Sequence, residues 1–537
     1  MMNRRNWIAV AVVTLLALAG GYGLRCWQAP RSSAASVLGP PFPGGPASGS
    51  TTADLPPQFK RGRELAQVVC AGCHVFPEPA LLPKRIWAHH VLPQVAVRLG
   101  VEPVNYEGMQ EGKILQEANL YPTEPAISEA DWFAIWDYYV ASAPNQPLPP
   151  APKPKLTVGL KNFRAKKLNF HGGMPMTSLV KIDPSRKLLY VGDGYAGMLA
   201  AVGPAGNVIN RVKLASAPVG LALKDAGAYA TLIGRYFPSD VLEGSLVFVP
   251  NNPRQPPQPV LEQLRRPVDA AVADLNQDGR DDLVVCSFGN RLGRFSWFEA
   301  RERGGFEEHV LLERPGAEHV ELSDFNKDGR LDIMVLMGQA REGVYIFYNE
   351  GQGLFRMETV FELPPPYGSV YFELVDFNRD GQVDLLTATG DNGDNPAPHK
   401  NYHGLRLYLN DGKNHFTEAW FYPMEGAYKV RAFDFDGDGD LDLAAIAYFP
   451  DFERGLMEGF VYFENQGNLR FVPLSIPESA DGRWIAMDAG DLDGDGDADI
   501  VLGSFIVGPT TIAVPPAVHE NWKTNGAAVL LLENLRR

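Results

Sequence analysis

Cysteine is scarce in this chain, and an excess of positive charge is missing altogether. Four cysteines among 537 residues are too few for the disulfide framework of a small secreted domain. Lysine and arginine number 49 against 64 aspartate and glutamate residues, so the formal net charge is −15. A nucleic-acid-binding surface usually shows a basic stripe, and the composition therefore argues against nucleic acid as a partner.

Long apolar runs are also few, and one of them lies at residues 7–24, behind Arg4 and Arg5. This pattern predicts, within residues 1–27, a signal peptide cleaved near Ala19 or an uncleaved N-terminal membrane anchor. Residues 28–57 are rich in Pro, Gly, Ser and Ala, which predicts a disordered spacer. Because a long spacer suits a tether, we favour the anchor. We expect the rest of the chain on the periplasmic or cell-envelope side, tethered to the inner membrane by residues 7–24.

Three chemistry-bearing residues, Cys70, Cys73 and His74, occur together in the stretch "VVCAGCHVFP". The pattern C-x-x-C-H is the attachment sequence of a c-type haem, in which two thiols bind the porphyrin and the histidine ligates the iron. A zinc site would need two more ligands, and the chain has no second cysteine pair. A thiol redox pair would need no adjoining histidine. The motif therefore predicts one covalent haem c, with His74 as the proximal ligand.

Two helices are predicted around this motif. The first covers the stretch "PPQFKRGRELAQVVC", with apolar positions at Leu65, Val68 and Val69. The second begins with a capping box at Ser128 and Asp131. Apolar residues then follow at helical spacing: Trp132, Ile135, Trp136, Tyr139 and Val140. These features resemble a class I cytochrome c domain over residues 58–145, which implies that the second helix packs across the first.

The sixth ligand of the haem iron is open between three candidates. Class I cytochromes offer a methionine from a loop in the second half of the domain, and Met109 occupies such a loop, "NYEGMQEG". His89 and His90 are rivals, and their alternative role is a polar helix face. We place Met109 first, a histidine second and an open coordination site third. A methionine ligand would give a higher reduction potential than two histidines.

Aspartates are concentrated in five loops that share one ligand pattern. Oxygen-bearing side chains occupy loop positions 1, 3, 5 and 9, and glycine occupies position 6. Ca²⁺ prefers such hard ligands, and the apolar strands around the loops distinguish them from EF-hands. The alternative is a set of Asp-rich turns. We expect about five Ca²⁺ ions with these ligands: Asp274, Asn276, Asp278, Asp282, Asp324, Asn326, Asp328, Asp332, Asp376, Asn378, Asp380, Asp384, Asp434, Asp436, Asp438, Asp442, Asp491, Asp493, Asp495 and Asp499.

The loops recur about every fifty residues, and each unit holds four short apolar strands. That period and strand count predict the blades of a β-propeller. Two units without the ligand pattern precede the five, so seven blades are expected. The last unit lacks its fourth strand, and the residues that follow Phe163 match such a strand. Pairing the two ends of the chain in one blade would close the ring and leave no free edge.

The five loops resemble the FG-GAP/VCBS repeats of integrin-α-type β-propellers, and the resemblance extends over residues 160–537. It implies a mainly structural role for calcium and places the loops between the first and second strand of each blade. The expected fold is therefore multidomain. A small all-α cytochrome c-like domain is followed by a Pro-rich linker, residues 146–159, and by an all-β seven-bladed propeller with calcium-binding loops.

The innermost strands of the propeller alternate charged and apolar residues, so one set of side chains lines the axis. His319, Glu321, Lys429 and Arg431 are candidate substrate-binding or catalytic residues there. The favoured alternative is a water-filled channel whose charges neutralise one another. The long polar loop at residues 390–404, with His399 and His403, is a second candidate for a pocket cap or metal site, against a solvated loop.

Together these features predict an exported c-type haem electron-transfer protein whose propeller docks a redox partner protein, an extracellular polymer or the cell envelope. One alternative is a dehydrogenase in which the propeller oxidises a small organic substrate, such as a sugar or alcohol, and passes electrons to its own haem. Another is an adhesion or structural propeller module. Fold alone does not decide between them.

Overall fold

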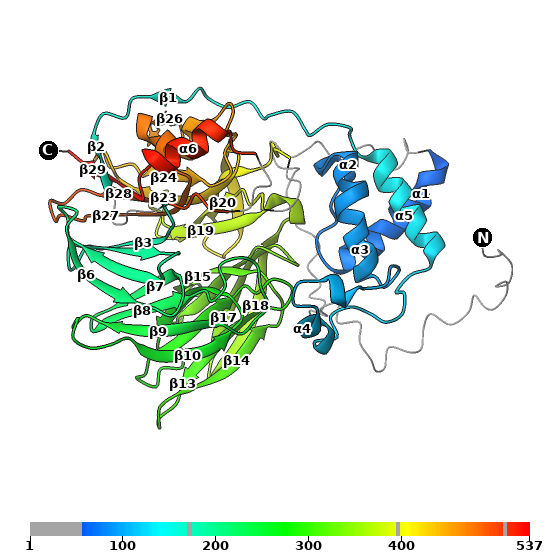
Figure 1. The fold of residues 1–537 in the computed structure, drawn as a ribbon, viewed down its shortest axis with the longest axis horizontal. Helices are drawn as coiled ribbons and strands as arrows, with labels where there is room; N and C mark the ends of the chain where they lie inside the picture. The colour runs from blue at the N-terminus through cyan, green and yellow to red at the C-terminus, as the bar shows by residue number, and fades with distance from the viewer. Residues whose placement is uncertain (1–55, 169–173, 394–397, 509–512, 537) are drawn as a thin grey trace.

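The computed structural model describes residues 56–168, 174–393, 398–508 and 513–536. The predicted leader and nearly all of the predicted spacer lie outside these residues. The described part has a helical N-terminal domain beside a large β-propeller (Figure 1). Among the described residues, no helix is both long enough and apolar enough to cross a membrane.

The helical domain contains α1 (Pro57–Val69), α2 (Lys84–Ile86), α3 (Leu92–Arg98), α4 (Gly112–Glu117) and α5 (Glu129–Ser142). Helix α1 contacts α5, as expected for the closing helix. The two are in close contact at Gly62, where a Cβ atom would collide with the carbonyl of Ala134, so glycine is required there. The buried face of α1 is formed by Gly62 and Ala66. Val68, which belongs to the apolar set of this helix, is instead 76% exposed.

The N-terminus of α5 is capped much as its sequence predicts. The Ser128 hydroxyl accepts a hydrogen bond from the Asp131 backbone N–H, at 3.1 Å. The Asp131 carboxylate accepts from the Ser128 hydroxyl rather than from its backbone, and it also accepts from Arg61. An acidic residue in the first turn further suits the positive end of the helix dipole. This cap fixes the start of the helix that carries most of the aromatic core of the domain.

The propeller has seven four-stranded blades, as predicted, and one blade has an added strand. Blades 1 and 2, which lack the Asp loops, contain β3 (Thr177–Asp183), β4 (Leu188–Asp193), β5 (Met198–Val202), β6 (Val208–Lys213), β7 (Pro218–Lys224), β8 (Gly227–Leu232), β9 (Gly244–Pro250) and β10 (Gln258–Leu264). Blades 3 and 4 contain β11 (Pro267–Ala273), β12 (Asp282–Ser287), β13 (Arg294–Ala300), β14 (Phe306–Leu312), β15 (Ala317–Ser323), β16 (Asp332–Met337), β17 (Gly343–Gly351) and β18 (Leu354–Glu362).

Blade 5 contains β19 (Ser369–Val375), β20 (Asp384–Thr389), β21 (Gly404–Asn410) and β22 (Phe416–Pro423). Blade 6 contains β23 (Ala427–Phe433), β24 (Asp442–Ala447), β25 (Phe460–Asn465) and β26 (Phe471–Ser475). Blade 7 contains β27 (Trp484–Gly490), β28 (Asp499–Ser504), β29 (Val529–Asn534) and, as its outermost strand, β2 (Phe163–Leu168). The ring is therefore closed by both ends of the propeller, as expected from the truncated last repeat.

Two elements depart from the predicted organisation. The second half of the predicted linker includes β1 (Thr157–Val158), which pairs in parallel with β26 and adds a fifth strand to blade 6. Helix α6 (Pro516–Thr524) is inserted between β28 and β29, and its Trp522 is fully buried against Phe452 and Ile506. Neither element follows the fifty-residue repeat, so the repeat pattern could not predict them.

The inner strands form the ring, because each contacts the inner strand of the next blade from β3 through β27 and back to β3. All five Asp loops join a first strand to a second strand, so they share one face of the propeller. The helical domain contacts the opposite face. Leu363, Tyr367 and Tyr402 of the propeller belong to the same apolar cluster as Trp87 and Tyr139. The Tyr402 hydroxyl also donates to the Leu81 carbonyl, at 3.0 Å.

Candidate functional site

The C-x-x-C-H motif lies where α1 ends. A single 3₁₀ turn, Cys70–Gly72, continues the helix, and the Cys73 N–H donates to the Cys70 carbonyl at 3.3 Å. This turn brings both thiols to one end of the helix. Neither cysteine forms a disulfide, and Cys73 is exposed while Cys70 is half-buried. Burial raises the pKa of the Cys70 thiol to about 11, which makes it a thiol rather than a thiolate at neutral pH.

His74 has the hydrogen-bonding pattern of a metal-binding imidazole. Its Nδ1 lies 2.9 Å from the Val75 carbonyl oxygen, so Nδ1 carries the proton and the Nε2 lone pair remains available. No hydrogen bond to Nε2 is recorded among the described residues. Burial lowers the pKa of His74, and the positive charges of Arg341 and Arg98 act in the same direction. The residues present therefore fit a haem iron, which needs a neutral imidazole as its ligand.

The three candidates for the sixth ligand lie in two different segments. His89 is exposed and His90 half-buried, and both lie in a π-helical turn, Trp87–Val91, before Pro93. Met109 is half-buried and directly follows a 3₁₀ turn, Tyr106–Gly108. In the described part of the chain, none of the three has a recorded hydrogen bond or ring contact with His74. The candidates keep the order that the sequence gives them.

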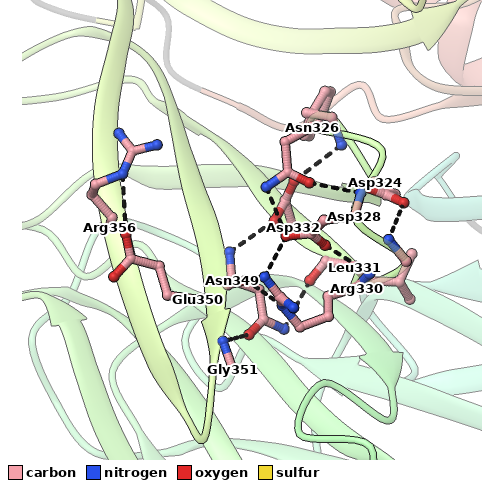
Figure 2. A network of polar contacts seen from close by, with 12 residues as sticks. Asp324, Asn326, Asp328, Arg330, Leu331, Asp332, Asn349, Glu350, Gly351 and Arg356 are labelled. Atoms are coloured by element: carbon pink, nitrogen blue, oxygen red, sulfur yellow. Dashed lines mark hydrogen bonds and ion pairs between the residues drawn. The ribbon is translucent and has the colours of Figure 1, made fainter.

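The Asp loop of blade 4 shows how these turns are held together (Figure 2). The Asp324 carboxylate accepts hydrogen bonds from the backbone N–H groups of Asp328, at 3.0 Å, and Gly329, at 2.8 Å. Asp332, at position 9, is fully buried and accepts from Phe325 and Asn349. It thereby joins the loop to strand β17. The fully buried Asp282, Asp384 and Asp442 and the 3%-exposed Asp499 accept from the corresponding third strands.

The five loops differ in how their negative charge is balanced. In blades 3 and 4, the Arg280 and Arg330 guanidinium groups pair with Asp278 and Asp328, so each of these loops contains its own counter-charge. In blades 6 and 7, aspartate replaces that arginine. There, three carboxylates from each loop have oxygen atoms within 4.8 Å of one another: Asp434, Asp436 and Asp438, and Asp491, Asp493 and Asp495. These two clusters have the chemistry for a divalent cation.

Comparison with known proteins bears on these loops directly. A family model described as an FG-GAP-like repeat matches residues 274–335, 324–387 and 397–445. The first two matches begin at the Asp loops of blades 3 and 4, and the third extends from blade 5 into β24 of blade 6.

The chain contains FG-GAP-like repeats.

No curated protein matches the chain. Among solved structures, the Cps50 (Swd1) β-propeller domain of Myceliophteria thermophila is 10% identical, with a TM-score of 0.42. The alignment covers 69% of this chain and 99% of that one. A protein from Lactobacillus plantarum is 13% identical, with a TM-score of 0.38, over 59% of this chain and 84% of its own. BBS1N in complex with ARL6DN is 11% identical, with a TM-score of 0.44, over 70% of this chain and 97% of its own. Similarity at this level gives no information on ligands.

The four axial candidates of the FG-GAP propeller lie on two inner strands, β15 and β23, on either side of β19. His319 has a carboxylate at each ring nitrogen: Asp269 lies 2.6 Å from Nδ1, and Glu321 lies 3.4 Å from Nε2. Burial by itself would lower the pKa of His319, but these two carboxylates raise it to about 9. His319 is therefore a cation at neutral pH and offers no free base.

Of the other two axial cations, Arg431 lies between two carboxylates and Lys429 lies over an aromatic ring. Arg431 lies 3.5 Å from a Glu373 oxygen and 3.7 Å from an Asp488 oxygen. The Lys429 ammonium lies 4.8 Å from the centre of the Tyr371 ring, and burial lowers its pKa to about 8. The Tyr371 ring also contacts His319, so one aromatic side chain connects the two candidate pairs. The structure thus brings all four candidates into one network of alternating charge.

The two histidines of the 390–404 loop lie in different surroundings. Residues 394–397 of this loop lie outside the described part. His399 lies 3.5 Å from Glu425 and 3.8 Å from Asp451. His403 is buried, and its Nε2 lies 3.3 Å from the Pro366 carbonyl. Burial keeps the pKa of His403 well below its ordinary value. Neither histidine belongs to a metal-ligand cluster among the described residues. Through Tyr402 this loop contacts the helical domain.

Sequence reasoning missed two features of these sites. Lys181 on β3 lies 3.5 Å from Asp488, so a blade without an Asp loop contributes to the axial network. Its position in the first strand of its repeat matches that of Arg431, which is the signal that could have found it. The buried position-9 aspartates also hold the loops to the third strands. The apolar residues that follow these aspartates in the sequence gave no indication that backbone N–H groups of the third strands bind the carboxylates.

Proposed function

We propose that this chain is an exported c-type haem electron-transfer protein, with a calcium-stabilised FG-GAP propeller that docks a redox partner. The observation that carries the proposal is the arrangement of Cys70, Cys73 and His74 at the end of α1. Two thiols one turn apart and a neutral imidazole are the groups that a covalently attached haem needs. When bound, the haem would accept and release single electrons at its iron.

The surrounding residues suit this role. Cys70 and Cys73 would attach the haem, and His74 would hold the iron through Nε2. Helix α5 crosses α1 at Gly62 and thereby fixes the helix that carries the motif. Val68, two residues before Cys70, is exposed and apolar. Exposed apolar side chains beside a redox group suit a transient protein–protein contact.

The propeller would act as a scaffold whose Asp loops bind calcium. The clusters of blades 6 and 7 offer the largest negative charge without an internal arginine, so they would bind most tightly. Cation binding would remove the repulsion between neighbouring carboxylates. Redox partner proteins, an extracellular polymer and the cell envelope are the docking partners we consider, and the N-terminal segment would hold the protein at the membrane.

A dehydrogenase centred on the propeller axis receives less support. Its candidate residues His319, Glu321, Lys429 and Arg431 are engaged with one another and with Asp269, Glu373 and Asp488. These pairs favour a channel whose charges cancel. A purely adhesive role would leave the haem motif without a purpose. Reduction of the haem by a sugar or alcohol in the purified protein would support the dehydrogenase.

The test of the proposal is covalent haem incorporation. Co-expression with a haem maturation system should give a coloured protein whose haem survives acid–acetone extraction. The Cys73→Ser variant should lose one thioether bond and Cys70→Ser/Cys73→Ser should lose covalent haem. Cys286→Ala, which alters a buried cysteine of strand β12, should keep it. A colourless wild-type product beside a correctly matured control cytochrome would refute the haem assignment.

A further inference from the structure

A glutamate of the helical domain is bound by the propeller. The Glu111 carboxylate accepts two hydrogen bonds of 2.5 Å from blade 2, one from the Ser239 hydroxyl and one from the Asp240 backbone N–H. Arg235 of the same propeller loop lies 3.7 Å away. Only 8% of the Glu111 side chain is exposed. Figure 1 shows α4, which begins at the next residue, on the side of the helical domain that faces the propeller.

This contact is built at some conformational cost. Glu111 is the N-cap of α4 and has φ 59°, in the left-handed region that a residue with a side chain rarely adopts. Such a conformation persists only where surrounding contacts hold it. The two charge-assisted hydrogen bonds to the propeller supply such contacts.

The propeller side of the contact is itself firmly held. Asp240 is 1% exposed, and its carboxylate accepts hydrogen bonds from three successive backbone N–H groups of blade 3, those of Asn290, Arg291 and Leu292, at 2.8–2.9 Å. Arg265 donates to the Asp240 carbonyl. The blade 2 loop is thus locked to blade 3, so Glu111 is bound by a rigid part of the propeller.

Glu111 is two residues from Met109, the first candidate for the sixth haem ligand. Gln110, between them, donates to the Pro238 carbonyl of the same propeller loop, at 3.4 Å. The segment 106–112 is compact, because the Gly112 N–H donates to the Met109 carbonyl and a Cβ atom at Gly112 would collide with the Tyr106 carbonyl. The position of Met109 is therefore tied to the two residues that the propeller binds.

We propose that the propeller holds the ligand loop of the haem domain, with Glu111 as the positioning residue, so that Met109 ligates the iron only while the two domains are docked. The inference rests on the proposed haem function. It gives the propeller a role in setting the haem ligation, and hence the reduction potential, because methionine ligation raises that potential.

The test uses the full-length haem-loaded protein and two substitutions on opposite sides of the contact. Glu111→Gln replaces one accepting oxygen by an amide donor, and Ser239→Ala removes a donor from the propeller. Glu107→Gln is the matched control, because Glu107 is an exposed glutamate of the same loop with no recorded side-chain contact in the described chain. The readouts are covalent haem content, the near-infrared band of a methionine-ligated ferric haem, and the reduction potential.

We expect Glu111→Gln and Ser239→Ala to keep covalent haem, lose most of the near-infrared band and show a lower reduction potential. Glu107→Gln should match the wild type, and Met109→Ala should reproduce the loss of the band. A band and potential unchanged in both contact variants would overturn the inference. A wild-type protein that has covalent haem but no such band would also overturn the inference, and the proposed haem function would then still stand. A wild-type protein without covalent haem would refute the proposed function as well.

Discussion

Phe163 is paired with Asn534 at the edge of blade 7, so the first long strand of the propeller lies against its last. The pairing continues in antiparallel register to Leu168 and Val529. Leu168 is 6% exposed and belongs to an apolar cluster with Val529 and Leu531 of β29 and with Val180 of blade 1. One side chain from the N-terminal end of the propeller therefore contacts both blades that meet at the closure.

Leu168→Ala should destabilise the whole propeller, because it leaves a cavity at the closure. We expect a loss of about 2–4 kcal/mol in the free energy of unfolding, measured by denaturant titration. Amide exchange should rise along β29. The control is Ile209→Ala on β6, where the side chain is 59% exposed and little change is expected. Equal losses for the two variants would contradict a closure held by Leu168.

Calcium should raise the melting temperature, and two loops should account for most of the increase. Binding to the native state alone contributes about 2.7 kcal/mol per site at a hundredfold excess over Kd. Asp436→Ala and Asp493→Ala should each remove one ion from blades 6 and 7, because alanine offers no ligand oxygen. Calorimetry in Ca²⁺ and in EDTA would measure both effects, with Asp411→Ala in an exposed turn of blade 5 as control. The same melting temperature with and without metal would mean that the loops are turns that bind no ion.

Arg280 should weaken cation binding in blade 3, because its guanidinium already neutralises Asp278. The Arg280→Gln substitution gives this loop the residue that blade 5 has at the same position, Gln382. We therefore expect tighter Ca²⁺ binding at this loop, by up to roughly fivefold, because a partly exposed ion pair is worth at most about 1 kcal/mol. Isothermal titration of the variant and the wild type would show it. Weaker binding in the variant would mean that Arg280 shapes the loop instead of competing with the ion.

The stability of the propeller should depend on pH through His319. Its pKa is about 9 in the folded chain against an ordinary 6.5, so the folded state binds this proton more tightly. The resulting stabilisation is fully present below pH 6.5 and is lost as pH rises towards 9, with an upper limit of about 3 kcal/mol. Lys429 acts in the opposite direction only above pH 8, because burial lowers its pKa to about 8. The decline should therefore be clearest between pH 6.5 and 8.

Chemical denaturation at several pH values would test this dependence. His319→Gln should reduce the decline between pH 6.5 and 8. The part that comes from Glu318 and Glu342, whose pKa values burial raises to about 8, should remain. His415→Gln is the matched control, because His415 is an exposed histidine that pairs with Asp411 away from the axis. It should keep the wild-type slope. A His319→Gln protein with an unchanged slope would show that another group binds the proton.

The FG-GAP blades were predictable because their signals are local. Asp, Gly and apolar residues recur at fixed spacing, and each loop with its two strands lies within about twenty residues of sequence. The closing strand was predictable because the last repeat lacks one strand and a free edge is unfavourable. The α5 cap was predictable for the same local reason, since Ser128 and Asp131 are one helical turn apart. The parallel strand β1 and helix α6 carry no such repeat signal.

The sequence alone determined the number of blades, the position of the Asp loops and the presence of a C-x-x-C-H motif at a helix end. Each of these depends on residues close together in the chain, where spacing fixes geometry. Only the tertiary structure decided that Asp269 and Glu321 flank His319, that Tyr402 contacts Leu81, and that Glu111 is bound by blade 2. These contacts join distant segments, and their register is set by the packing of blades and domains against one another, which residue spacing does not encode.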